Sequence, residues 1–315
     1  MDSITQAALG AAIGQSILGK KASPKGAILG AAIATIPDLD VLFYAIYEPY
    51  EMLSIHRGLS HSILFSLIGG VIISYILSTW EKLKNISLLR LLFFTWLCLI
   101  THSLLDTFTA YGTQLLMPFS DVRIGFDSIN VVDPLYTVPL LIGLILSLWK
   151  KKHQFNNWGL ILSTIYLGFT LINKQHVHSN LEAIFTSKGI NYQQLLSMPV
   201  GIANLNWYGV ARTSDSIHMR KYSVLNDDDT EVFSFPINDF LLDEIEPEVA
   251  ENMRWFAKGY YTVEKIDNVI RIYNLQVDMR GVIRTDKTYA PTAGYFEFTK
   301  QNDSLIYSTG TIVIE

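Results

Sequence analysis

The chain has 315 residues, of which 50% are hydrophobic and 17% are charged, and its formal net charge is −5. Soluble globular domains carry about 25% charged residues, so this composition argues against an ordinary soluble protein. The negative net charge gives no support to nucleic-acid binding. The single cysteine, Cys98, excludes a disulfide within the chain and any cluster of thiolate ligands.

The charged residues are distributed unevenly along the chain. Residues 1–175 contain 10 acidic and 12 basic residues, whereas the shorter stretch 176–315 contains 19 acidic and 12 basic residues. Such a difference indicates two regions in different solvents. We therefore expect a transmembrane domain over residues 1–175 and a soluble domain over residues 176–315.

Six apolar segments in the first region are candidates for membrane helices, because about 20 helical residues cross a bilayer core about 30 Å thick. They cover residues 3–19, 26–47, 60–80, 88–108, 132–149 and 158–173. The first is the weakest candidate because it is rich in alanine and glycine, and Pro37 interrupts the second. The sequence thus predicts a polytopic α-helical membrane bundle of five to six segments.

The first two segments each contain a pair of glycines four residues apart, Gly10 with Gly14 and Gly26 with Gly30. Small residues at this spacing let membrane helices approach closely. Segments rich in alanine and glycine also produce the pattern by chance. The pairing of these two helices is therefore left open by the sequence.

Basic residues alternate between the two sides of the predicted bundle. The loops after the first, third and fifth segments hold nine of them, whereas the opposite side holds Arg57, Arg123 and Lys174. The positive-inside rule then predicts that both termini lie outside the cytoplasm. We expect a multi-pass protein of the cytoplasmic (inner) membrane, with its C-terminal domain outside the cytoplasm.

The C-terminal region reads as an α+β domain. Alternating apolar residues predict strands, and one stretch with helical periodicity predicts a helix over residues 239–258. The predicted strands cover residues 207–212, 216–225, 260–265, 269–279, 294–298 and 304–314.

The polar residues of the membrane region fall at one predicted level, on the outer side. Ionisable groups are costly in membrane helices and usually mark a functional site that faces the bundle interior. The residues concerned are Asp38, Asp40, His56, Arg57, His61, His102, Asp106 and Asp133.

A metal ion is the simplest reason for gathering these side chains. His102 and Asp106 are four residues apart, so they share one helix face and can converge on one point. His56 and His61 cannot share a helix face at a spacing of five, although a loop could bring one or both inward. Imidazole and carboxylate together favour zinc, with manganese or iron as alternatives. A bound divalent ion lowers the pKa of water and so generates a nucleophile.

Each of these residues also has a structural explanation when taken alone, since a buried histidine usually just completes hydrogen bonds and an aspartate often caps a helix. Their coincidence at one depth favours the metal site. His153, His176, His178 and His218 lie elsewhere, and we expect them to be ordinary loop or surface residues. Motifs of zinc proteases, serine hydrolases and phosphate-binding loops are absent from the sequence.

At these residues the sequence resembles the YdjM-like family of membrane-bound metal-dependent hydrolases, over about residues 1–150. The segments that carry the resemblance are Met1-Asp2-Ser3-Ile4-Thr5-Gln6-Ala7, Ile36-Pro37-Asp38-Leu39-Asp40, His56-Arg57-Gly58-Leu59-Ser60-His61-Ser62, His102-Ser103-Leu104-Leu105-Asp106, Tyr111-Gly112-Thr113-Gln114 and Val132-Asp133-Pro134-Leu135.

The family is distantly similar to zinc-dependent phospholipase C and to the single-strand-specific zinc nucleases, which take one zinc from an Asp, a His and a later His-x-x-x-Asp. Carried over by position, this resemblance implies a ligand set of Asp38 or Asp40, His56 or His61, His102 and Asp106. Many members carry a histidine where this chain has Gln6, which is a poor metal ligand. The resemblance therefore implies one ion rather than several.

These observations predict a membrane-embedded hydrolase in which metal-activated water attacks a phosphoester or ester bond of a membrane lipid or envelope substrate. Arg57 or Arg123 is expected to hold an anionic headgroup. His56 or Asp133 is expected to act as general base or to orient a ligand. The alternative is a non-catalytic membrane protein with a structural polar cluster and an outer binding domain. A transporter has little support, because the segments show no repeat.

Overall fold

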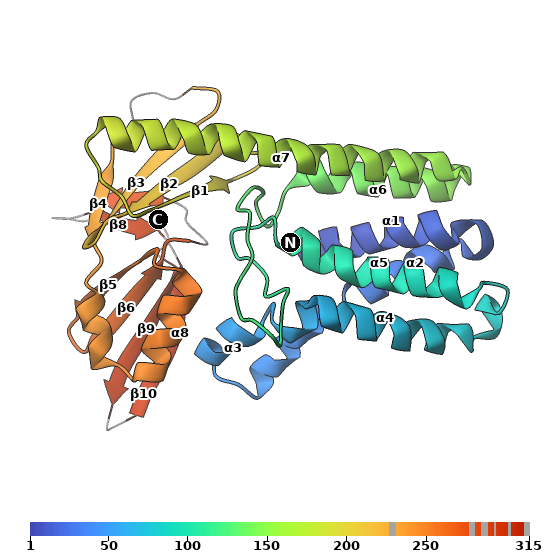
Figure 1. Cartoon of the computed structure of the whole chain (residues 1–315), viewed down its shortest axis with the longest axis horizontal. Coiled ribbons are helices and arrows are strands. Elements are labelled where there is room, and N and C mark those ends of the chain that lie inside the picture. The colour runs from blue at the N-terminus through green and yellow to red at the C-terminus, as the bar shows by residue number, and fades with distance from the viewer. Residues whose placement is uncertain (227–230, 277–280, 285–288, 293, 302–303, 312–315) are drawn as a thin grey trace. The chain divides into compact units, whose positions relative to one another are not determined.

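The computed structural model describes residues 1–226, 231–276, 281–284, 289–292, 294–301 and 304–311 (Figure 1). The chain divides into two compact units. Unit 1 consists of Met1–Ile46 and Ile55–Ile172, and unit 2 of Tyr47–Ser54 and Asn173–Glu315. The division after Ile172 falls within one continuous helix, α7 (His153–Ser187).

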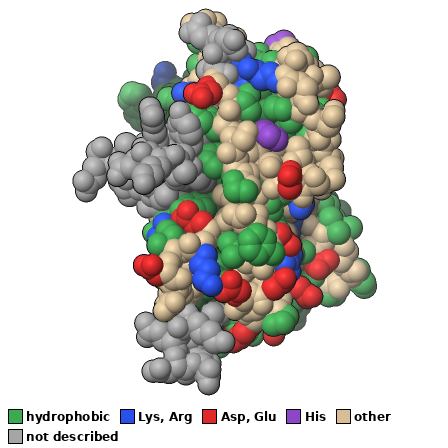
Figure 2. All heavy atoms as spheres, turned by 90° about the vertical axis from the view of Figure 1, so that its left-hand side faces the viewer, with side chains coloured by type: hydrophobic (Ala, Val, Ile, Leu, Met, Phe, Trp, Pro, Cys, Tyr) green, Lys and Arg blue, Asp and Glu red, His purple; other side chains and the backbone are tan. Residues whose placement is uncertain are grey.

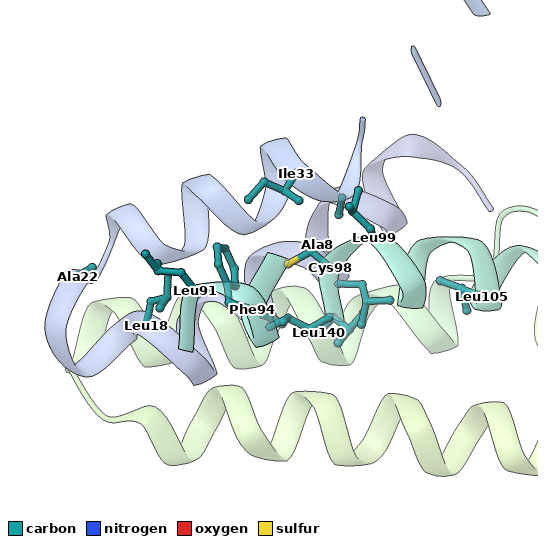
Figure 3. Packing of buried hydrophobic residues seen from close by; sticks show 14 of the residues in the cluster. Ala8, Leu18, Ala22, Ile33, Leu91, Phe94, Cys98, Leu99, Leu105 and Leu140 are labelled. Atoms are coloured by element: carbon teal, nitrogen blue, oxygen red, sulfur yellow. The ribbon is translucent and has the colours of Figure 1, made fainter. Parts of the chain in front are cut away.

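Unit 1 is a helical bundle (Figure 1). Its helices are α1 (Ser3–Ala22), α2 (Lys25–Ala34), α4 (Ile63–Ser78), α5 (Leu88–Asp106), α6 (Pro134–Lys150) and the first part of α7, with short 3-10 helices η1 (Pro37–Ala45), η2 (Leu59–His61) and η3 (Glu81–Leu83). Helix α5 supplies much of the core, because Leu91, Phe94, Cys98 and Leu99 are fully buried (Figure 3). The residues between α5 and α6 form an irregular segment that pairs with itself in one bridge, Thr113 with Ile124.

Two helices, α5 and α7, are long and apolar enough to cross a membrane. Two further spans are possible if each of two bent pairs counts as one: α2 with η1, bent by 50°, and the stretch Pro49–His61 with α4, bent by 53°. Helix α6 is apolar but has only 17 residues, and α1 is diluted by polar side chains such as Gln6 and Gln15. The structure thus supports two to four spans, and the predicted five to six are not confirmed.

The pairing of the first two helices, left open by the sequence, is confirmed by the structure. A methyl group added at Gly10 would lie 2.3 Å from the carbonyl oxygen of Gly30, and one added at Gly14 would lie 2.0 Å from that of Gly26. Only residues without a side chain allow the two backbones to approach so closely. The four glycines therefore fix α2 against α1 and, through α2, the start of η1.

Unit 2 contains two four-stranded antiparallel sheets, with strand orders β1-β2-β3-β4 and β10-β9-β6-β5, and a small pair β7-β8. The helices of this unit are the second part of α7 (residues 173–187), α3 (Pro49–Ile55, of which the last residue belongs to unit 1), η4 (Asp239–Glu244) and α8 (Pro247–Ala257). The strands are β1 (Gln194–Val200), β2 (Asn206–Arg212), β3 (Ser216–Ser223), β4 (Phe233–Pro236), β5 (Tyr261–Ile266), β6 (Val269–Asn274), β7 (Gly281–Arg284), β8 (Tyr289–Thr292), β9 (Gly294–Gln301) and β10 (Ser304–Thr311).

The C-terminal half of α7 covers the first sheet. Val177, Leu181 and Phe185 follow one another at a spacing of four, so they form one face of the helix, and they are buried against Trp207 and Ala211 of β2. Elsewhere acidic and basic side chains are interspersed over the surface (Figure 2). This distribution is typical of a domain in water.

The predicted α+β character of the C-terminal region is confirmed, with differences in detail. Strands β1, β4, β7 and β8 were not predicted. The predicted helix over 239–258 is divided into η4 and α8, because Pro247 starts a new helix. The ends of two predicted strands, residues 277–279 and 312–314, lie outside the described residues.

Substitution of Gly30 by alanine tests the contact between α1 and α2. The added methyl group would lie 2.0 Å from the Gly10 carbonyl oxygen, so we expect Gly30→Ala to destabilise the bundle by about 1–3 kcal/mol. The measurement is the thermal unfolding of the detergent-purified protein. Gly168→Ala on α7, where nothing lies within 4 Å of the added atom, is the matched control and should not lower stability. Equal midpoints for the two variants would contradict the close packing.

Candidate metal centre

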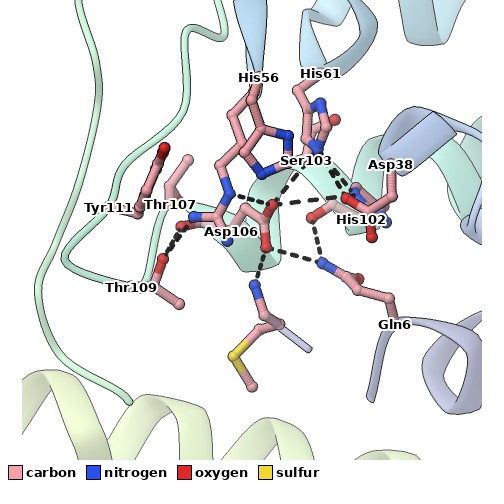
Figure 4. Close-up of polar contacts among 12 residues, drawn as sticks. Gln6, Asp38, His56, His61, His102, Ser103, Asp106, Thr107, Thr109 and Tyr111 are labelled. Atoms are coloured by element: carbon pink, nitrogen blue, oxygen red, sulfur yellow. Dashed lines mark hydrogen bonds and ion pairs between the residues drawn. The ribbon is translucent and has the colours of Figure 1, made fainter. Parts of the chain in front are cut away.

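Three segments that are far apart in the sequence meet at one end of the unit 1 bundle (Figure 4). Asp38 lies in the first turn of η1, His61 is the last residue of η2, and His102 and Asp106 lie on successive turns at the end of α5. Side-chain oxygen or nitrogen atoms of these four residues all lie within 4.8 Å of one another. Among the described residues this is the one group of His, Cys, Asp or Glu that could hold a metal ion.

The local sequence explains why η1 and η2 stop short of being regular membrane helices. Proline in a helix interior removes a backbone hydrogen bond and disfavours helical geometry in the residue before it. Accordingly, α2 ends ahead of Pro37, and η1 starts with Pro37 in its first turn. Ser62 caps α4 by accepting a hydrogen bond from the backbone N–H of Phe65 at 3.0 Å, which leaves His61 just outside that helix. The breaks therefore place Asp38 and His61 where side chains of two chain segments can converge.

The predicted convergence of His102 and Asp106 is present. Both side chains are buried, and the His102 Nε2 atom lies 4.0 Å from the Asp106 Oδ2 atom. The Nε2 atoms of His61 and His102 lie 3.1 Å apart, and each is 3.4 Å from Asp38 Oδ1. His61 Nε2 is 3.6 Å from Asp106 Oδ2.

These spacings fit a tetrahedral ion. Zinc binds nitrogen and oxygen ligands at about 2.0–2.2 Å, and in a regular tetrahedron this radius corresponds to ligand atoms about 3.3–3.6 Å apart. The five distances above run from 3.1 to 4.0 Å, so they bracket that range. The sixth pair, Asp38 with Asp106, lies within 4.8 Å, so the cluster is close to the size of the ligand set of one tetrahedral ion.

The hydrogen-bonding of Asp106 also fits a bound cation. Its Oδ1 atom accepts from the Gln6 side-chain amide at 2.9 Å and contacts the α-amino group of Met1. Its Oδ2 atom is buried and makes no hydrogen bond, although the Arg57 Nε atom lies 3.1 Å away. A buried oxygen without a hydrogen bond is costly, and a cation within the cluster would satisfy it.

Asp40 and His56, both predicted as ligands, lie outside this group of four. Asp40 Oδ1 pairs with His56 Nδ1 at 2.8 Å, and its Oδ2 accepts from the Ser60 hydroxyl at 2.9 Å and from the Arg57 backbone N–H at 3.1 Å. The same Oδ2 atom is 3.4 Å from His61 Nδ1. Asp40 thus stands behind His61, in the position from which a carboxylate orients a histidine ligand.

Arg57 is held at the centre by an unusual backbone conformation. Its φ of 59° lies in the left-handed region, which non-glycine residues adopt at a cost. Two hydrogen bonds of the Arg57 backbone stabilise this conformation. The Arg57 N–H donates to the Asp40 carboxylate, and the Arg57 carbonyl oxygen accepts from the N–H of Gln114. The guanidinium also donates to the Thr109 hydroxyl at 2.9 Å and lies over the ring of Tyr111. The backbone conformation therefore serves to place a positive charge beside Asp106.

The second arginine, Arg123, is also brought to this end of the bundle. It lies over the same Tyr111 ring, 4.9 Å from its centroid, and donates to the Tyr111 carbonyl oxygen. Tyr111 lies in a segment that carries the family resemblance, but its contact with both arginines, and that of Thr109 with Arg57, could not be predicted from the sequence. Only the tertiary fold of the segment after α5 brings them together.

Asp133 and the histidines outside the cluster have other roles. Asp133 caps α6, accepting from the Leu135 N–H, and it accepts a hydrogen bond from the Tyr166 hydroxyl at 2.8 Å. His178 pairs with Ser197 and His218 with Ser234. Asp133 therefore has a structural role at the start of α6.

Comparison with known proteins identifies the family. The family model described as YdjM inner membrane protein matches residues 1–177, which is more than half of the chain. The chain therefore belongs to this family of inner membrane proteins. No solved structure matches the chain.

Two curated relatives are similar to the chain. The protein named uncharacterized protein YfhP, of Bacillus subtilis (strain 168), is 28% identical over 212 residues, which cover 62% of this chain and 63% of YfhP. The inner membrane protein YbcI of Escherichia coli (strain K12) is 33% identical over 122 residues, which cover 38% of this chain and 69% of YbcI. The chain thus spans less than two thirds of YfhP. Neither name states an activity, so the expected similarity to metal-dependent hydrolases and phospholipase C is not confirmed.

Removal of a candidate ligand should abolish metal binding. We expect detergent-purified protein to contain about one divalent ion per chain, and His102→Ala and Asp106→Ala to lower the content to background, since each removes one of four converging atoms. Elemental analysis by mass spectrometry measures the content. His178→Ala, which changes a histidine paired with Ser197, is the control and should keep its metal. Unchanged metal content in both cluster variants would contradict the site.

Substitution of Asp40 tests whether this residue orients His61 or binds the metal ion itself. Asp40→Asn keeps the shape but loses the charge behind His61, so we expect metal affinity to fall by about 10–100-fold while full occupancy is still reached at excess metal. Competition with a coloured chelator measures the affinity. Asp133→Asn, a buried aspartate that caps α6, should leave the affinity unchanged. Complete loss of binding in Asp40→Asn would make Asp40 a ligand instead.

Proposed function

We propose that this chain is a membrane-embedded, metal-dependent hydrolase that cleaves a phosphoester or ester bond in a lipid or envelope substrate. The observation that carries the proposal is the group of four converging ligand atoms from Asp38, His61, His102 and Asp106. Two neutral imidazoles and two carboxylates suit zinc best, with manganese or iron as alternatives. A divalent ion held there would supply activated water at neutral pH.

The charges around the cluster favour an anionic substrate. The carboxylates of Asp38, Asp40 and Asp106 outnumber the guanidinium groups of Arg57 and Arg123 by one, and a divalent cation would make the region net positive. Arg57, with its planar guanidinium, is suited to bind a phosphate through two hydrogen bonds. A phosphoester is therefore the preferred substrate bond.

His56 is the residue best placed to move a proton. It is partly exposed, with 21% of its side chain accessible, whereas His61 and His102 are fully buried. Asp40 holds its Nδ1 atom, which leaves Nε2 to exchange a proton with a substrate or with water. We assign His56 as general base or acid and Asp40 as the residue that orients it.

We also propose the topology that the basic residues predict, with the site and both termini on the outer side of the inner membrane. In this arrangement α1, which is less apolar, and α6, which is shorter, join the candidate spans as membrane segments, which gives the five to six of the sequence prediction. The cluster would then lie at the level of the lipid headgroups, within reach of a substrate that diffuses in the membrane.

A second candidate is a non-catalytic membrane protein in which the cluster is structural. The contact of Asp106 with both Arg57 and the α-amino group of Met1 favours it, because these positive groups already compensate a buried carboxylate. In this case the polar cluster would hold the ends of α1, α5 and η2 together.

Turnover in a defined membrane distinguishes the two candidates. We expect metal-loaded protein in nanodiscs of mixed phospholipids to release phosphate or a phosphorylated headgroup, a chelator to stop the release, and zinc to restore it. Mass spectrometry of lipids and headgroups measures the products. Arg57→Lys keeps the charge but loses the planar pair of donors, so it should bind metal normally and turn over about 10–100-fold more slowly.

The structural candidate makes the opposite prediction. His102→Ala would then lower the unfolding temperature without removing any turnover, and no bond would be cleaved in any of the lipids by the unsubstituted protein. That result would overturn the hydrolase proposal.

A further inference from the structure

The short helix η1 combines cluster residues with an unusual amount of exposed apolar surface. Asp38 and Asp40 lie in its first turn, and Asp40 is buried. Every residue from 41 to 46 is exposed, although nearly all of them are large and apolar. The exposed apolar side chains on and just after η1 are Leu39, Val41, Leu42, Phe43, Tyr44 and Ile46.

The geometry of a 3-10 helix connects these side chains to the cluster. Residues three apart are eclipsed in such a helix, so they form straight ridges along its axis. Val41 and Tyr44 continue the ridge that starts at Asp38, and Phe43 continues the ridge that starts at Asp40. Leu42 continues the ridge between them, which starts at Leu39. An apolar surface therefore leads away from Asp38 of the candidate metal centre and from Asp40 beside it.

Two observations indicate that this surface lies against lipid. Helices α2 and η1 together form one bent candidate membrane span, and the chain belongs to a family of inner membrane proteins. Because η1 exposes large apolar side chains beyond its two aspartates, its surface is more stable in contact with lipid than with water. The residues after Asp40 would thus contact hydrocarbon, while Asp38 faces the polar cluster.

We propose that η1 is the acyl-chain-binding surface of the site, and that the site is entered sideways from the bilayer by a membrane lipid. The headgroup phosphate binds at the cluster beside Arg57, and the acyl chain lies along the ridges that carry Leu42 and Phe43. This inference rests on the proposed function, and it deepens it by naming an amphiphilic phosphate as the ligand. A free phosphate compound from the water phase would leave the apolar surface without a role.

The test compares a phosphate with and without an alkyl chain. Cobalt-loaded protein in nanodiscs is titrated with inorganic phosphate and with dodecyl phosphate, and the visible absorption of the cobalt site reports binding. Dodecyl phosphate is compared among variants at equal mole fraction in the lipid. We expect it to bind the unsubstituted protein at least tenfold more tightly than inorganic phosphate does.

Variants of η1 show whether this surface binds the alkyl chain of the ligand. Leu42→Asn and Phe43→Asn should each weaken the binding of dodecyl phosphate about tenfold, which is the value of one large apolar contact. Both variants should leave the binding of inorganic phosphate unchanged. Ile28→Asn on α2 is the matched control, because Ile28 is 66% exposed and Leu42 is 68% exposed. It should change neither ligand. All three side chains are on the surface, so the variants should fold.

The outcomes separate this inference from the proposed function. A protein that binds cobalt but shows the same affinity with and without the alkyl chain overturns the role of η1 and leaves the metal site standing. Equal weakening of dodecyl phosphate by Leu42→Asn and Ile28→Asn also overturns it, because partition into lipid would then explain the affinity. A protein without a cobalt spectrum overturns both proposals.

Discussion

The cost of burying charge organises the end of the bundle where α5 stops. Asp106 is almost completely buried, and a buried carboxylate is tolerated only when positive charge and hydrogen-bond donors meet it. Arg57 supplies the charge from one side, and Gln6 supplies a donor from another. Arg57 reaches this place only because its backbone is held in a left-handed conformation by Asp40 and Gln114. This ion pair and the Gln6 hydrogen bond thus tie the start of α1, the η2 segment and the end of α5 together.

The breaks in the helices follow from the same requirement. Backbone that leaves helical geometry near lipid must have its polar groups satisfied within the protein. Around η2 this is achieved by the Ser62 cap and by the hydrogen bonds of the Arg57 backbone N–H and carbonyl groups. Discontinuous helices in membrane proteins usually occur where the broken ends line a binding site. Here the breaks deliver Asp38 and His61, so the irregular backbone and the candidate ligands have one cause.

Local periodicity explains which parts of the site could be predicted from the sequence. His102 and Asp106 were correctly placed on one face because both lie in a regular helix with a known repeat. The choice between Asp38 and Asp40, or between His56 and His61, depends on the turn of a 3-10 helix and on a loop, and neither has a reliable pattern. The same limit applied to β1, which contains Pro199, and to β4, which has only four residues. The polar residues in the second part of α7 made its continuation hard to predict, although Val177, Leu181 and Phe185 keep the four-residue spacing of a helix face.

The hydrogen bonds of Asp106 bear on how many ions the cluster could hold. A carboxylate that bridges two cations usually offers one oxygen to each, but Asp106 Oδ1 already accepts from the Gln6 amide and contacts the Met1 amino group. Gln6 also donates to the His102 carbonyl oxygen at 3.2 Å, which fixes its amide nitrogen toward the cluster. A histidine at this position could present a lone pair instead, whereas the glutamine nitrogen can only donate. Because Oδ2 alone is left to face the other three ligand atoms, the arrangement favours a single ion, and the glutamine is the residue that sets this limit.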